Sequence, residues 1–103
     1  MVKKIDNKQF ETEVKSSTGV CLVDFFATWC GPCTMLAPTL EELSKEFSGS
    51  VKFFKIDIDQ YPDLAAEYKI MSIPTVILFK DGVPAGKIVG LRDKGDYIDL
   101  IEM

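Results

Sequence analysis

Residues 20–33 have the sequence VCLVDFFATWCGPC, and this stretch decides the fold. Its first half is a continuous apolar run rich in β-branched and aromatic residues, which predicts a buried strand over residues 20–27. Residues 34–47 have apolar side chains at helical spacing and predict a helix. Cys30 and Cys33 are therefore expected where a strand passes into a helix, with Pro32 suited to the first helical turn.

The position of the two thiols favours their ionisation. Unpaired N–H groups and the positive end of the helix dipole lie at a helix start, and both stabilise an anion. The thiolate is the nucleophile of thiol–disulfide exchange. We expect Cys30, just outside the first turn, to attack a disulfide. Cys33, one turn further in and more covered, would complete the exchange.

Composition narrows the classes of protein that the chain can represent. Its 103 residues predict a single domain over residues 1–103. The net charge is −4 and the lysines are dispersed, which argues against a nucleic-acid surface. No apolar stretch is long enough to span a membrane, and the N-terminal residues lack the apolar region of a signal peptide. These observations favour the cytoplasm, where disulfides are mostly transient and catalytic.

Two other uses of the cysteines, a zinc site and a permanent structural disulfide, have less support in the sequence. A structural zinc site needs four ligands, but only Cys21 remains beside the pair and the chain has no histidine, so no metal is expected. A permanent disulfide that closes so short a loop adds little stability through chain entropy. Redox cycling is therefore the favoured use of Cys30 and Cys33.

Periodicity and turn residues place the other elements. Asp6 or Asn7 is expected to cap the first helix, and Pro38 to kink the second. Alternation of strands and helices favours an α/β protein with parallel pairing early in the chain. The turn at Asp81 and Gly82 predicts that the last two strands form an antiparallel hairpin. Further strands are predicted at residues 2–5, 51–58, 75–79 and 85–89, and further helices at 8–15, 61–68 and 93–102.

Asp24 is a lone carboxylate in the apolar run of the predicted central strand. Burial disfavours its charged form, so its pKa is expected to rise. It is either a proton acceptor for Cys33 or a structural aspartate bonded to backbone or water. Lys55, on a neighbouring strand, is either a partner that holds Asp24 charged or an ordinary solvated lysine.

Several segments together resemble the thioredoxin family over essentially the whole chain. They are VDFFATWCGPC at residues 23–33, KIDID at 55–59, IPT at 73–75, FKDG at 79–82 and VG at 89–90. The resemblance implies the thioredoxin fold, a central mixed five-stranded sheet flanked by four helices. It also favours the proton-acceptor role for Asp24, because family members have an aspartate at this place.

The resemblance further implies a docking surface for clients around the two cysteines. The Ile73–Pro74 bond would be cis and face the cysteines, and the backbone of Ile73 would pair with an extended client segment. Each surface residue alone has an ordinary explanation in packing or turn geometry. The implied surface comprises Trp29, Gly31, Pro32, Ile58, Ile73, Pro74 and Gly90.

The implied activity is that of a general protein-disulfide reductase, a monomer without a bound cofactor. Its partners would be disulfide-containing client proteins and a thioredoxin reductase that restores the dithiol with electrons from NADPH or ferredoxin. One alternative is a redox-inert binding module that uses the same apolar surface. Another is a disulfide oxidase or isomerase, although such relatives usually have a histidine between the cysteines, where this chain has Gly31 and Pro32.

Four positions depart from the commonest family pattern. Phe26 stands where many members have a second tryptophan, and Met71 and Ser72 stand where Arg-Gly is frequent; these two departures concern partner preference. Cys21 is an additional thiol. About 20 Å of strand separates Cys21 from residue 27, whereas a disulfide needs Cα atoms within roughly 7 Å. We therefore expect Cys21 to be buried and to take no part in exchange.

Overall fold

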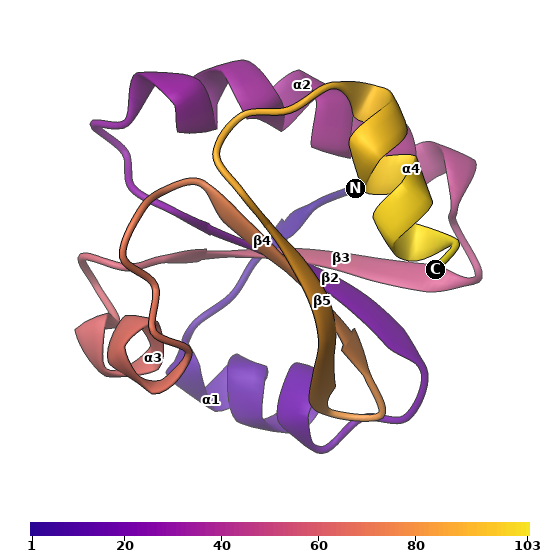
Figure 1. Cartoon of the computed structure of the whole chain (residues 1–103). Helices are drawn as coiled ribbons and strands as arrows, with labels where there is room; N and C mark the ends of the chain where they lie inside the picture. Colours follow the sequence, from indigo (N-terminus) through magenta and orange to yellow (C-terminus); the bar gives the residue numbers. More distant parts are fainter.

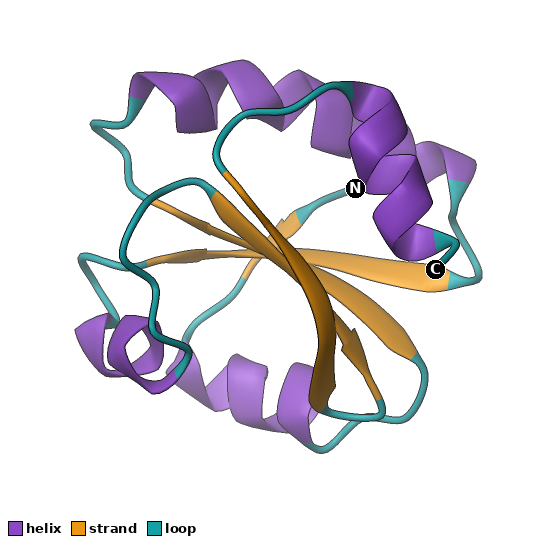
Figure 2. Ribbon diagram, viewed as in Figure 1, coloured by secondary structure: helices purple, strands orange, loops and turns teal.

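A computed structural model describes all residues from 1 to 103 and contains one five-stranded sheet with helices on both faces (Figures 1 and 2). Helices α2 and α4 cover one face, and α1 and α3 cover the other. None of the helices is long and apolar enough to cross a bilayer. The elements in chain order are β1 (Lys3–Lys4), α1 (Asn7–Phe10), the π-helical segment η1 (Glu11–Lys15), β2 (Val20–Phe26), α2 (Gly31–Glu46), β3 (Val51–Asp57), α3 (Pro62–Glu67), β4 (Thr75–Lys80), β5 (Val83–Val89) and α4 (Lys94–Ile101).

Strand β2 is the centre of the sheet, whose order is β1-β3-β2-β4-β5. It runs parallel to β3, with Asp24 opposite Lys55, and antiparallel to β4, with Asp24 opposite Val76. Strand β1 is parallel to β3, while β4 and β5 form the antiparallel hairpin that the turn residues predicted. The predicted α/β class with a mixed sheet is therefore confirmed.

Side chains of β2 alternate between two cores. Cys21 and Phe25 point into the core that α1 covers, together with Phe10. Leu22 points into the opposite core, against Leu36 of α2. Because successive strand residues face opposite sides, Asp24 shares the face of Leu22 and lies under α2. The sheet thereby separates Cys21 from Asp24.

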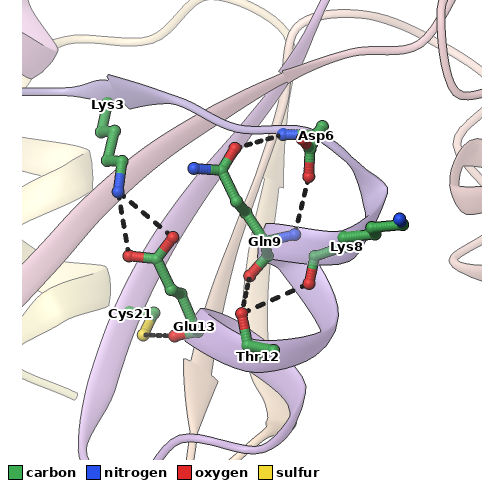
Figure 3. A network of polar contacts seen from close by, with 7 residues as sticks. All are labelled: Lys3, Asp6, Lys8, Gln9, Thr12, Glu13 and Cys21. Carbon is green, nitrogen blue, oxygen red and sulfur yellow. Dashed lines mark hydrogen bonds and ion pairs between the residues drawn. The ribbon is translucent and has the colours of Figure 1, made fainter.

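The N-terminal segment is tied down by side chains as much as by the sheet. Asp6 caps α1: its carboxylate accepts from the N–H of Gln9 at 2.7 Å, and the Gln9 side chain accepts from the N–H of Asp6 at 3.0 Å (Figure 3). Strand β1 is shorter than the predicted 2–5, because the N–H of Val2 donates to Glu41 rather than to a strand.

The helix predicted at residues 8–15 exists, but its second half is a π-helix that the periodicity did not indicate. Helix α2 begins at Gly31 rather than residue 34, and β5 begins at Val83 rather than residue 85. The other ends lie within one residue of the prediction, as expected for fraying element ends.

Candidate active site

Cys30 and Cys33 are joined by a disulfide bond at the start of α2, with their Cα atoms 5.3 Å apart. Cys30 is the N-cap residue, with an extended backbone, and its Sγ accepts from the N–H of Cys33 at 3.2 Å. Pro32 lies in the first turn, where backbone N–H groups have no partner within the helix, so the missing N–H of proline costs no hydrogen bond. A sulfur at the N-cap faces the unpaired donors of the helix start, and those donors stabilise a thiolate when the bond is reduced.

The prediction that Cys33 is more covered than Cys30 is wrong for this disulfide-bonded state. Both residues are 5% exposed. The bond holds the two sulfurs together, and both residues pack with Ala27, while Ile58 and Ile73 cover the same cluster. Exposure therefore does not separate the two cysteines, and only their positions relative to the helix start do.

The Ile73–Pro74 peptide bond is cis, as the family resemblance implied. The carbonyl oxygen of Ile73 lies 3.9 Å from Sγ of Cys30. Thr75, the residue after Pro74, begins β4, and its hydroxyl donates to the carbonyl of Ser72 at 2.6 Å. This hydrogen bond from Thr75 to Ser72 fixes the loop, so the carbonyl group of Ile73 stands beside the disulfide.

The other expected surface residues lie around this pair. Gly90 is tied to the loop, because its N–H donates to the carbonyl of Pro74 at 2.8 Å. Gly31 and Pro32 are exposed at the first turn of α2. Trp29 is 71% exposed, and its indole Nε1 donates to Asp59 at 2.7 Å. The structure thus brings together apolar and glycine positions from four separate segments of the chain, although Pro74, which was predicted to lie on this surface, is buried.

Two surface residues were missed by the sequence analysis. Asp59 orients the indole of Trp29 and ends the KIDID segment, but nothing in the sequence pairs it with a tryptophan thirty positions away. Met71, two residues before Ile73, is 93% exposed. Its position was noted only as a departure from the family pattern, and its exposure could not be foreseen.

Asp24 is the buried ionisable group of the site. It is 4% exposed, and its Oδ1 atom has no hydrogen-bond partner. Burial raises the pKa of Asp24 to about 7, and the positive charge of Lys55 opposes this rise. The predicted rise from desolvation is confirmed, and a carboxyl that titrates near neutrality can both take and release a proton.

A cavity of about 170 Å³ connects Asp24 with the disulfide. Its lining includes Asp24, Cys33, Thr34 and Lys55. The ammonium of Lys55 lies 5.6 Å from the ring centroid of Phe26. Lys55 is thus half-buried at the cavity and forms no ion pair. This position is intermediate between the two alternatives, a lysine that pairs with Asp24 and an ordinary solvated lysine. No group of three or more His, Cys, Asp or Glu side chains is arranged to hold a metal ion.

A disulfide at a helix N-cap, beside a peptide carbonyl and over a buried carboxyl, is the arrangement of a dithiol–disulfide oxidoreductase. Comparison with known proteins identifies the family. The thioredoxin family model matches residues 1–103. The thioredoxins of Staphylococcus aureus strains Mu50, MW2 and N315 are each 46% identical to the chain over 101 residues, which cover 98% of this chain and 95% of each relative. The chain belongs to the thioredoxin family.

Family membership and the geometry together define the activity. The chain is a protein-disulfide oxidoreductase that reduces disulfides through the Cys30–Cys33 dithiol. Disulfide-containing proteins are its clients, and members of the family depend on a reductase to restore the dithiol.

Proposed function

We propose that the two cysteines divide the reaction between them. The Cys30 thiolate attacks one sulfur of a client disulfide, forms a mixed disulfide, and releases the other client sulfur as a thiolate. Cys33 then loses its proton and attacks Sγ of Cys30, which releases the second client sulfur. The client gains two electrons and the pair becomes the Cys30–Cys33 disulfide. The observation that carries this assignment is the place of Cys30 at the N-cap, 3.9 Å from the Ile73 carbonyl.

Asp24 accepts the proton of Cys33 in this scheme. Both line the same cavity, and a carboxyl with a pKa of about 7 is half ionised at neutral pH. Lys55 tunes Asp24, because its positive charge favours the ionised carboxylate.

The client docks on the surface around the disulfide. The carbonyl of Ile73 accepts a hydrogen bond from an extended client segment, which recognises backbone rather than a particular side chain. Recognition of this kind suits a general reductase with many clients. The apolar contacts come from Trp29, Gly31, Pro32, Ile58, Ile73 and Gly90, but not from Pro74, which is buried.

The remaining features concern how the protein works in a cell. We place it in the cytoplasm as a monomer whose single domain spans residues 1–103. A thioredoxin reductase supplies its electrons from NADPH or ferredoxin. No bound cofactor takes part, because the electrons reside in the two thiols.

Equilibration against a series of glutathione buffers tests the reductase assignment. A midpoint more reducing than the glutathione couple is expected, so that the dithiol can pass electrons to client disulfides. An oxidase or isomerase would give a more oxidising midpoint. A redox-inert binding module would show the same number of free thiols before and after a mild reductant.

A further inference from the structure

Asp24 stands between two cavities rather than at the end of one. The cavity beside the disulfide, about 170 Å³, reaches Cys33 and Thr34. A second cavity of about 30 Å³ is lined by Val2, Leu40 and Glu41 and also by Asp24, Ala37 and Lys55. Both cavities are therefore lined by Asp24, Ala37 and Lys55. A space of this volume that three ionisable side chains line has room for at least one water molecule.

The cavities follow one side of helix α2. Cys33, Ala37 and Glu41 are separated by four residues each, so they lie one above another along the helix. Cys33 belongs to the first cavity, Ala37 to both and Glu41 to the second. The route from the disulfide to Glu41 thus passes Asp24, which lines both cavities.

Glu41 is held over the second cavity by the backbone. Its Oε1 accepts from the N–H of Val2 at 2.5 Å, and Val2 lines the same cavity. The side chain is half-buried, so it connects the cavity with solvent. Val2 thus bonds to Glu41 instead of joining strand β1, which begins at Lys3, and its N–H holds the Glu41 carboxylate at the cavity.

We propose that Glu41 relays the proton of Asp24 to solvent while a protein client is attached to Cys30. The inference rests on the proposed role of Asp24. A client joined to Cys30 covers the disulfide end of the molecule and, with it, the first cavity at Cys33 and Thr34. The second cavity opens further along α2, away from that surface, and remains free.

The proton steps balance without a further reactant. Cys33 gives its proton to the Asp24 carboxylate and becomes the attacking thiolate. Protonated Asp24 passes the proton through cavity water to the Glu41 carboxylate, which releases it to bulk water. Asp24 is then ionised again, and Glu41 returns to its starting state.

Other charged or titratable groups around Asp24 fit this route. Lys55 of β3 lines both cavities and favours the ionised Asp24, and Lys4 of β1 lies beyond it, 5.8 Å from the Phe26 ring centroid. Tyr97 of α4 is fully buried, and burial raises the pKa of its hydroxyl, so it stays neutral. The residue opposite Asp24 on β4 is the apolar Val76. Glu41 is the carboxylate of the second cavity that also reaches solvent.

The test compares Glu41→Gln with the wild type in a single turnover of the reduced protein. Glutamine keeps an acceptor oxygen for the Val2 N–H but cannot exchange a proton. Decay of the mixed disulfide is followed by acid quenching and mass analysis, with a folded protein disulfide and with a short cyclic peptide disulfide as clients. Glu42→Gln is the matched control, since Glu42 is exposed, neighbours Glu41 and pairs with Lys94 instead.

We expect Glu41→Gln to slow decay several-fold with the protein client, to increase the solvent deuterium isotope effect, and to leave the peptide reaction and the Asp24 titration midpoint unchanged. Glu42→Gln should match the wild type. Equal decay in Glu41→Gln and wild type with the protein client, or equal slowing with both clients, would overturn the relay. The variant Asp24→Asn separates the relay through Glu41 from the proton-acceptor role of Asp24. If the mixed disulfide decays slowly in Asp24→Asn but at the normal rate in Glu41→Gln, only the relay is refuted. If it decays at the normal rate in Asp24→Asn, the role of Asp24 itself is refuted.

Discussion

Asp24 and Lys55 lie opposite each other on adjacent parallel strands, yet they form no ion pair. The ammonium of Lys55 lies 5.6 Å from the centroid of the Phe26 ring, and Oδ1 of Asp24 has no hydrogen-bond partner. The lysine therefore acts on the carboxyl only through its charge. Burial outweighs that charge, and the result is an Asp24 that titrates near neutrality.

The raised pKa of Asp24 predicts a pH-dependent loss of stability. The folded pKa of about 7 exceeds the ordinary aspartate pKa of 3.8, so ionisation costs more in the folded state and stability falls as pH rises from about 4 to about 7. About three pKa units correspond to a loss of roughly 4 kcal/mol, which levels off above pH 7. Asp24→Asn should remove this fall and be more stable than the wild type at pH 8, as measured by denaturant unfolding. Parallel pH–stability curves for the two proteins would refute the assignment.

Asp24→Asn should also slow the step that uses Cys33. Asparagine cannot accept a proton, and loss of a general base costs about 100-fold or more in rate. The decay of the mixed disulfide measures this step, while its formation at Cys30 should proceed normally. Slower formation with normal decay would assign Asp24 to Cys30 instead.

Replacing Lys55 should raise the pKa of Asp24 further. Lys55→Met removes the positive charge that favours the ionised carboxylate but keeps an apolar side chain near Phe26. The pH profile of mixed-disulfide decay should move to higher pH. Lys52→Met is the control, because Lys52 is exposed on the same strand and lies opposite Cys21. An equal displacement in both variants would mean that net charge, not the Lys55–Asp24 pair, sets the profile.

The two cysteines should differ when each is replaced by serine. Cys33→Ser retains the attacking thiol and should accumulate a mixed disulfide with the client through Cys30. Cys30→Ser should accumulate none, because the first attack is lost. Non-reducing electrophoresis with mass analysis identifies the linked residue. Trapping by Cys30→Ser alone would reverse the assignment of roles.

Cys21 should be inert in the folded protein. It is 1% exposed on the face of the sheet opposite Asp24, and its Sγ lies 3.6 Å from the carbonyl oxygen of Glu13 (Figure 3). Alkylation of the reduced native protein should modify Cys30 first and Cys21 only after denaturation. Cys21→Val should keep full activity and change the free energy of unfolding by less than about 1.5 kcal/mol. Rapid labelling of Cys21 in the native state would show that this strand end opens.

The sequence predicted the sheet and the disulfide more completely than the groups around them. Continuous apolar runs and the hairpin turn indicate strands and their pairing, because these patterns are local. The bond between Trp29 and Asp59 and the position of Lys55 over Phe26 depend on how distant segments meet. Cys30 and Cys33 are equally exposed because a disulfide joins them and because Ile73 packs against both. Ile73 lies forty residues after Cys33, so no local sequence pattern could predict this packing.

The most direct test follows which thiols are consumed when fully reduced protein meets a client disulfide without oxygen. After the reaction, free thiols are alkylated and each cysteine-containing peptide is analysed by mass spectrometry. We predict one client disulfide reduced per chain, Cys30 and Cys33 recovered as an unlabelled pair joined to each other, and Cys21 still a thiol. Client reduction that leaves Cys30 and Cys33 labelled, or a disulfide that includes Cys21, would contradict the account.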